Sequence, residues 1–374
     1  MSTTGETRFP SDVYRRRVQR AADLASENGF DALVVSPGPD LQYLVGSRAN
    51  TFERLTALVI PAAGSPRIVV ARLEVPSLSA SAVGDLGIEV ADWTDGQDAH
   101  AIALAGLGRQ PRIAISDAMP ALHVVPLAQR SGATPSLATP VLRELRMIKD
   151  GNEIDVLRRA GAAIDRVHAR MGEWLRPGRT ERDVAADIAD AIVAEGHSGA
   201  EFVIVGSGPN GADPHHEHSD REITAADIVV IDIGGPVEPG YNSDSTRTYC
   251  FTEPPAQIAE TYAALQEAQA AAVAAVRPGV RAESVDAAAR DVLGERGLAD
   301  HFIHRTGHGI GLSVHEEPYI VAGNTIELRP GMAFSVEPGV YFPGQWGARI
   351  EDIVTVTDEG CEPLNLRPHE LTVL

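Results

Sequence analysis

An internal duplication in the second half of the chain constrains the fold more than any other feature. The segment RPGRTERDVAADIADAIVAEG (176–196) is echoed about one hundred residues later by RPGVRAESVDAAARDVLGERG (277–297). Each copy follows a helical pattern and leads into an apolar strand with a glycine-rich turn, at 202–208 and 302–309. A repeated order of elements predicts two related halves. Two such halves facing each other form a crevice, where ligands commonly bind.

The first 140 residues predict a smaller α/β domain. Residues 11–29 have the periodicity of an amphipathic helix, and short apolar strands then alternate with helices. The strands are expected at 31–36, 55–61, 66–74, 88–93 and 112–116. This part holds no cluster of His, Asp and Glu near its strands, so we expect it to serve support, oligomer contacts or substrate gating. A helical pattern over 141–175 breaks at Lys149–Gly151, which predicts domains 1–140 and 141–374.

Five side chains in short, apolar-flanked stretches of the last third are candidate metal ligands. A lone aspartate in an apolar strand is costly to bury unless it is paired or bound to metal. A hairpin over 228–251 would set two of the acids side by side, and a hairpin of 332–342 with 348–357 would approach the other two. Four carboxylates and one imidazole suit a hard divalent ion, and their charge would balance two such ions. The five are Asp232, Asp244, His308, Glu337 and Glu351.

Three other patterns are weaker. GSGPNG (206–211) matches a dinucleotide-binding fingerprint, but the polar, proline-containing segment after it favours a loop over the required helix. The run HHEH (215–218) could bind zinc, but adjacent loop histidines rarely converge on one ion. His304 and His308 have helical spacing, yet the glycines around them make a helix unfavourable.

Composition excludes several classes of protein. The formal net charge of −20 argues against nucleic acid or an anionic membrane as a partner. Two cysteines predict no disulfide framework and favour a reducing, cytoplasmic setting. The N-terminus has no basic region followed by an apolar run, so no signal peptide is expected, and no apolar run is long enough to span a membrane.

The metal-ligand stretches resemble the pita-bread metallopeptidases, most closely the Xaa-Pro dipeptidase (prolidase) and aminopeptidase P branch. The resembling motifs are VVIDIGG, GYNSDSTRTY, HRTGHGIGLSVHEEPYI, SVEPGVYFPGQWGARIEDIV and the domain opening LRMIKDGNEIDVLRRA. The resemblance covers 141–374 strongly, and 11–140 resemble a creatinase-like N-terminal domain more weakly. It implies an α+β pita-bread catalytic domain with pseudo-twofold duplicated halves, preceded by the smaller α/β domain, and commonly a homodimer.

The resemblance also implies roles for particular residues. Asp232 would bind one metal ion, His308 and Glu337 the other, and Asp244 and Glu351 both; Mn²⁺ is expected, with Co²⁺ or Zn²⁺ as alternatives. The further residues implied are His215, His315 and Glu337 as catalytic, and His304, Arg349 and Tyr241 as substrate-binding. Two departures are visible, because relatives usually show a shorter spacing than the twelve positions from Asp232 to Asp244 and a larger, apolar residue in place of Ser245.

The implied reaction is hydrolysis of Xaa-Pro bonds at a free N-terminus by a metal-activated water, with Glu337 as general base. An amide to proline has no N–H, so a pocket that does not require this donor can select it. Three alternatives stay open at this point: a metal-free hydrolase of the same fold, a metal-dependent lyase or amide hydrolase acting on another small molecule, and a binding module. The sequence does not distinguish dipeptides from longer peptides as substrates.

Overall fold

The computed structural model describes residues 8–50 and 53–374, and the chain divides into two compact units, Met1–Arg146 and Met147–Leu374. Residues 1–7, part of the segment in which no signal peptide is expected, lie outside the described range. The boundary predicted between residues 140 and 141 lies within helix α5 (Thr139–Met147). No helix in the described ranges combines the length and the apolar character that a membrane span needs. Both cysteines are free thiols.

The N-terminal unit is the expected α/β domain, built on one six-stranded sheet in the order β4-β3-β2-β1-β5-β6. The strands are β1 (Ala32–Val35), β2 (Ala57–Pro61), β3 (Arg67–Ala71), β4 (Glu89–Trp93), β5 (Ile113–Ile115) and β6 (Ser136–Leu137). The helices are α1 (Ser11–Glu27), α2 (Pro39–Val45), α3 (Ala99–Leu104) and α4 (Ala121–Ser131). Every residue of β1 is buried because it pairs antiparallel with β2 on one side and parallel with β5 on the other. β2 and β3, which correspond to the strands expected at 55–61 and 66–74, pair antiparallel.

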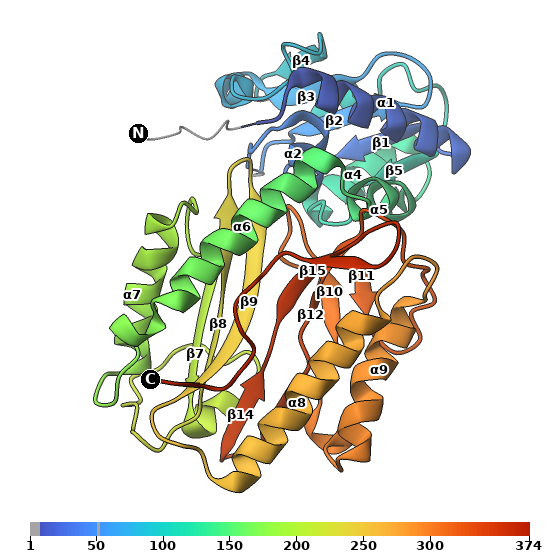
Figure 1. The fold of residues 1–374 in the computed structure, drawn as a ribbon. Coiled ribbons are helices and arrows are strands. Elements are labelled where there is room, and N and C mark those ends of the chain that lie inside the picture. The colour runs from blue at the N-terminus through green and yellow to red at the C-terminus, as the bar shows by residue number, and fades with distance from the viewer. Residues whose placement is uncertain (1–7, 51–52) are drawn as a thin grey trace. The chain divides into compact units, whose positions relative to one another are not determined.

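The second unit has the pita-bread arrangement of two larger sheets, each covered by a pair of helices, and it also contains a small two-stranded sheet (Figure 1). In the first half, α6 (Gly151–Ala169) and α7 (Glu181–Ala194) cover the sheet β17-β9-β8-β7. In the second half, α8 (Ala256–Ala275) and α9 (Ala282–Glu295) cover the sheet β11-β10-β12-β15-β16. The strands are β7 (Phe202–Ser207), β8 (Val229–Val237), β9 (Tyr241–Cys250), β10 (Gly307–Gly309), β11 (Glu316–Ile320), β12 (Ala333–Val336), β15 (Asp352–Val356), β16 (Cys361–Pro363) and β17 (Thr372–Val373).

The predicted duplication is confirmed down to single hydrogen bonds. In the first Arg-Pro-Gly turn the N–H of Gly178 donates to the carbonyl of Ile223 at 2.8 Å, and in the second the N–H of Gly279 donates to Leu328 at 2.8 Å. Both glycines have positive φ, 86° and 82°, a conformation that other residues adopt only with strain. The Arg-Pro-Gly shared by the two copies therefore forms the same turn, which lies at the same point before α7 and before α9.

Two strand predictions need correction. The strand expected over 302–309 is only β10, so His308 lies within a strand rather than in a turn after it. The predicted hairpin of 332–342 with 348–357 is split in two. Its outer part pairs β12 with β15, whereas its tip is a separate ribbon of β13 (Gly339–Phe342) and β14 (Trp346–Arg349). The break in each arm falls at a candidate ligand, Glu337 and Glu351, where the backbone turns away from regular pairing.

Crowding around β10 yields a testable consequence. A Cβ built on Gly307 would lie 1.8 Å from the carbonyl oxygen of Ser335, so alanine there must push β10 away from β12. We expect Gly307→Ala to lower the free energy of unfolding by about 1–3 kcal/mol, as overpacking typically does. Urea denaturation of the wild type and of Gly307→Ala measures the difference in the free energy of unfolding. Gly294→Ala is the matched control because that position is open and helical; equal effects of the two substitutions would contradict the prediction.

Candidate active site

Antiparallel pairing brings the acids of the first half together. In the hairpin of β8 and β9, Asp232 pairs with Thr246 and Gly234 pairs with Asp244, so the two aspartates are diagonal neighbours on one face of the sheet. Thr246 also meets the second half, because its hydroxyl donates to Glu351 Oε2 at 2.7 Å and its backbone forms a bridge to Glu351. β9 therefore joins the two halves at the site, which explains why all ten of its mostly polar residues are buried.

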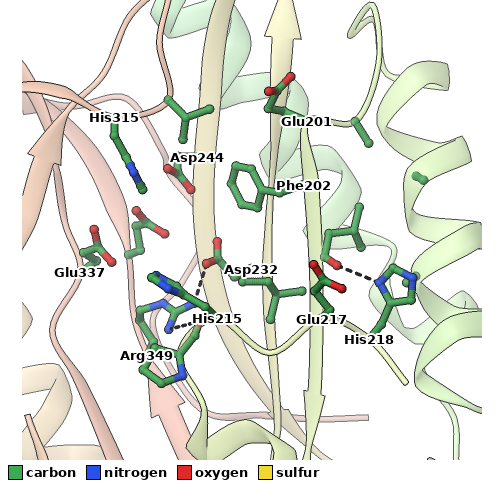
Figure 2. A pocket seen from close by; sticks show the side chains of 18 of the residues that line it. Glu201, Phe202, His215, Glu217, His218, Asp232, Asp244, His315, Glu337 and Arg349 are labelled. Atoms are coloured by element: carbon green, nitrogen blue, oxygen red, sulfur yellow. Dashed lines mark hydrogen bonds and ion pairs between the residues drawn. The ribbon is translucent and has the colours of Figure 1, made fainter. Parts of the chain in front are cut away.

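The five candidate ligands predicted from the sequence converge on one cavity of about 1240 Å³. One potential ligand atom each from Asp244, His308 and Glu351 lie within 4.8 Å of one another. His308 Nε2 is 3.2 Å from Glu337 Oε1 and 3.6 Å from Asp244 Oδ2. Figure 2 shows the carboxylates of Asp232, Asp244 and Glu337 turned toward the same space. Residues up to 119 positions apart thus share a single centre.

Electrostatics make this cluster costly in the metal-free chain. Burial raises the pKa of Asp244 well above its ordinary value, and the charge of Asp232 adds to the effect. Burial raises the pKa of Glu351 in the same way, reinforced by Asp244. For Glu337, burial is outweighed by the hydrogen bond and charge of His308, which lower the pKa to about 2. Buried acids that repel one another are a common feature of functional sites.

An unsatisfied oxygen indicates what this cluster can hold. Oδ1 of Asp232 is buried and has no hydrogen-bond partner in the parts of the chain that the structure describes. A buried carboxylate oxygen without a donor is unfavourable unless a cation meets it. The neighbouring side chains of the cluster offer carboxylate oxygens and one imidazole nitrogen, which are ligand atoms suited to hard divalent ions. The residues present therefore fit a metal centre.

Arg349 holds this centre in place and is not free to bind a substrate carboxylate, which corrects the sequence interpretation. The side chain is buried, with only 2% of its surface exposed. Nη2 pairs with Asp232, Nε donates to Thr246 Oγ1 at 3.0 Å, and Nη1 donates to the Tyr341 hydroxyl at 2.7 Å. Burial raises the pKa of Tyr341 to about 12, although the nearby guanidinium acts to lower it, so the hydroxyl stays protonated. All three guanidinium nitrogens are engaged within the protein.

The predicted catalytic histidines line the same cavity from different elements. His315 packs against His308 with ring centroids 4.0 Å apart, and its pKa is lowered to about 4 by burial and by the nearby charges of His308 and Arg305. His304 contacts the Tyr341 hydroxyl through Nε2 at 2.9 Å. His215 lies on the loop that follows β7, exposed at the cavity (Figure 2).

Tyr241 does not belong to the site, which is a second correction. Its ring is buried, with 1% exposed, and its hydroxyl donates to Glu153 of α6 at 2.6 Å. It does not line the cavity that holds the acids. Tyr241 lies three positions before Asp244 in β9, so the two side chains point to opposite faces of the sheet.

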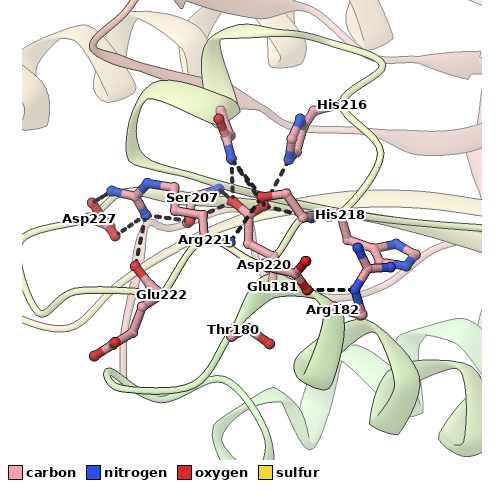
Figure 3. A network of polar contacts seen from close by, with 12 residues as sticks. Thr180, Glu181, Arg182, Ser207, His216, His218, Asp220, Arg221, Glu222 and Asp227 are labelled. Atoms are coloured by element: carbon pink, nitrogen blue, oxygen red, sulfur yellow. Dashed lines mark hydrogen bonds and ion pairs between the residues drawn. The ribbon is translucent and has the colours of Figure 1, made fainter.

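A buried glutamate that the sequence analysis missed anchors the loop carrying His215 (Figure 3). Glu181, at the first position of α7, is fully buried. Its oxygens accept hydrogen bonds from the backbone and hydroxyl of Ser207 and of Ser219, at 2.6–3.0 Å. Asn210 and His216 add further contacts at 2.8–3.1 Å. An acid in the first turn of a helix ordinarily serves the helix itself, so the sequence carried no signal for this role.

The stability provided by Glu181 should depend on pH. Burial would raise the pKa of this carboxyl, but the hydrogen bonds from Ser207, Ser219 and His216 outweigh it and hold the pKa at about 2. Because the folded pKa is depressed, the stabilisation is present above the unfolded value near 4.5 and is lost as pH falls toward 2. We expect Glu181→Gln to cost about 3 kcal/mol at pH 7.

The difference in unfolding free energy between the wild type and Glu181→Gln should shrink steadily between pH 5 and pH 3, measured by urea denaturation. Asp190→Asn, on the exposed face of the same helix, is the matched control and should change little at either pH. A difference that stays constant across this range would contradict the assignment of the charge as the stabilising feature.

The two patterns rejected on the sequence have other roles. After β7, GSGPNG forms a short 3₁₀ turn (Gly208–Ala212) and not the α-helix of a dinucleotide site. The loop histidines do not converge, because His216 contacts Glu181 and His218 contacts the carbonyl of Val203 at 3.2 Å. Only His215 of the HHEH run is left facing the cavity without a hydrogen bond from its ring among the described residues.

Comparison with known proteins agrees with this geometry. Residues 155–358 match the model of metallopeptidase family M24, and residues 17–148 match the creatinase/prolidase N-terminal domain. The chain is 63% identical to a probable dipeptidase PepE of Mycobacterium tuberculosis, covering 99% of both proteins. It is 30% identical to an Xaa-Pro dipeptidase of Pyrococcus horikoshii, covering 96% of this chain and 99% of that one.

Comparison with solved structures identifies similar proteins of the same kind. The crystal structure of dipeptidase PepE from Mycobacterium ulcerans superposes with a TM-score of 0.96 at 62% identity, covering 98% of this chain and 99% of that one. The family match spans the strands that carry the acidic cluster, and the second match spans the N-terminal sheet. The chain therefore belongs to metallopeptidase family M24, with a creatinase/prolidase N-terminal domain.

Proposed function

We propose that this peptidase is a dinuclear metal-dependent dipeptidase that hydrolyses Xaa-Pro bonds at the N-terminus of dipeptides or short peptides. The observation that carries the proposal is the convergence of four carboxylates and one imidazole on a single cavity. Asp232, Asp244 and Glu351 are buried, and one oxygen of Asp232 has no hydrogen-bond donor among the described residues. Relatives named dipeptidase and Xaa-Pro dipeptidase support the same substrate class.

The metal ligands we propose are the five acidic and imidazole side chains of the cavity. Asp232 would hold one ion, His308 and Glu337 the other, and Asp244 and Glu351 would contact both. Mn²⁺ is the ion proposed, with Co²⁺ or Zn²⁺ as alternatives. When bound, the ions supply Lewis-acid polarisation of the scissile carbonyl and lower the pKa of a water molecule.

The side chains of the cavity would handle the protons. Glu337 is the proposed general base: its pKa of about 2 keeps it ionised at neutral pH, and Ser335 donates to its Oε1 at 2.9 Å and fixes its orientation. His315 and His215 face the same space and can orient the substrate or protonate the leaving nitrogen. His304 forms part of the wall through its contact with Tyr341.

Selectivity for proline would arise because the pocket does not require an amide N–H donor from the substrate. An Xaa-Pro amide offers no N–H, and a pocket with no acceptor aimed at that hydrogen loses nothing when proline is bound. We also propose a homodimer, as the family resemblance implies, and a reducing cytoplasmic setting, which the two unpaired cysteines support.

A substrate panel tests the proposal. Gly-Pro, Ala-Pro and an Xaa-Pro tripeptide are assayed after chelation and after adding back Mn²⁺, Co²⁺ or Zn²⁺. We expect turnover only with metal, and faster for Xaa-Pro than for matched Xaa-Ala substrates. Full turnover after complete metal removal would refute the metal requirement. Absence of turnover on any peptide would favour an enzyme of the same fold acting on another small molecule.

A further inference from the structure

We infer that Arg305 binds the free carboxylate of the substrate and thereby makes this site selective for dipeptides; the inference rests on the proposed peptidase function. Three arginines line the cavity. Arg349 is committed to Asp232, and Arg182 is paired with Asp220 at 2.7 Å. Arg305 has no carboxylate partner among the residues that the structure describes, so it is the cavity arginine available to an anion.

The position of Arg305 is set by an aromatic platform. Its guanidinium carbon lies 4.4 Å from the ring centroid of Tyr319 in β11. Stacking on a ring face holds a guanidinium in place and leaves its N–H edge free to bind a carboxylate with two parallel hydrogen bonds. The half-buried side chain also has lower desolvation cost to bind an anion than a fully hydrated surface arginine would have.

The platform lies next to the candidate metal centre. In the pairing of β10 with β11, Tyr319 is directly opposite His308, so the two side chains lie on the same face of the sheet. Only the side chain of Tyr319 therefore separates Arg305 from His308, a proposed metal ligand. In a dipeptide, only three bonds separate the scissile carbonyl carbon from the terminal carboxylate carbon. A tripeptide moves that carboxylate three bonds farther, out of register with this arginine.

The opposite wall of the cavity disfavours an anion. Glu201 and Glu217 line the β7 side, where Figure 2 places their carboxylates near Phe202 and His218. Neither glutamate side chain has a cationic partner among the described residues. A substrate carboxylate on that side would meet like charge, whereas at Arg305 it would meet an unpaired cation. The charges of the two walls therefore give the substrate one orientation.

The test compares free and capped substrates. Arg305→Met keeps an apolar stem on Tyr319 but removes the charge, and Arg305→Lys keeps the charge without the planar fork. We expect Arg305→Met to lower kcat/KM for Ala-Pro and Ala-Leu about 10- to 100-fold, mainly through KM, because a charge-assisted hydrogen bond is lost. The amide-capped substrates should change less than about threefold, and Arg305→Lys should recover part of the loss.

Arg182→Met is the matched control, since it removes another cavity arginine with its own carboxylate partner, and it should affect free and capped dipeptides equally. Equal losses on free and capped substrates in Arg305→Met, or no loss on either, would overturn the inference. If the wild type turns over no peptide, the proposed function fails instead. Calorimetric binding of Ala-Pro and its amide in the presence of Mn²⁺ then decides the role of Arg305: the wild type must prefer the free acid and Arg305→Met must not.

Discussion

Replacing Asp244 by asparagine is expected to abolish activity and metal binding while leaving the fold intact. The substitution keeps the size of the side chain but removes one of the buried negative charges that the proposed ions neutralise. We expect kcat/KM on Ala-Pro to fall at least about 1000-fold, since a metal centre supplies several kcal/mol of transition-state stabilisation. Metal content after desalting, measured by atomic emission, should fall together with activity.

The same substitution should stabilise the metal-free protein. Burial and the charge of Asp232 raise the pKa of Asp244, so this carboxylate is unfavourable without a cation and its neutral replacement is not. The unfolding temperature of the metal-free variant should therefore exceed that of the metal-free wild type. Ser245→Ala is the matched control. Ser245 is next to Asp244 in the chain, and its buried hydroxyl has no hydrogen-bond partner among the described residues. An Asp244→Asn protein that binds metal and turns over normally would refute the assignment.

Glu337→Gln is expected to lower kcat by about 10²- to 10⁴-fold, the range typical of a lost general base. Glutamine can still accept hydrogen bonds from Ser335 and His308, which lie 2.9 and 3.2 Å from Glu337 Oε1, so the local structure should persist. Steady-state kinetics and metal analysis of the same sample separate the two proposed roles. Retained metal with lost kcat identifies the base, and lost metal identifies the ligand.

Ser335→Ala provides a graded comparison for Glu337. It removes one hydrogen bond that orients the carboxylate but leaves its charge and its proposed ligand oxygens. We expect a loss of kcat below about tenfold, because a single hydrogen bond contributes on the order of 1 kcal/mol. A Ser335→Ala variant as impaired as Glu337→Gln would mean that the orientation of the carboxylate, and not its basicity, limits the reaction.

Much of the architecture was predictable because it is encoded in local pattern. The repeated Arg-Pro-Gly turns, the alternating apolar strands and the break before Gly151 indicated two domains and two related halves. The hairpin that pairs Asp232 with Thr246 followed from strand length and a glycine-containing tip. The acids could be recognised as candidate ligands because a carboxylate in an apolar strand is too costly to leave unexplained.

The hydrogen-bond and ion-pair partners of the polar side chains were not predictable in the same way. Arg349 lies two residues before a candidate ligand and was expected to meet substrate, yet it pairs with Asp232, 117 positions earlier. Tyr241 was assigned to the pocket but bonds to Glu153. Glu181 gave no signal because its partners, at 207–219, lie across a loop that the sequence leaves undefined.

The sequence by itself determined which chemical groups are present, which periodic segments carry them, and that the second half of the chain is built twice. Only the tertiary structure decided which of those groups are already paired and which face the cavity unpaired, as Arg305 does. The physical reason is the range of the interactions. Helices and strands follow from neighbours a few residues apart, whereas the partners of a buried charge are set by packing between distant segments, from 26 residues apart for Glu181 and Ser207 to 117 for Asp232 and Arg349.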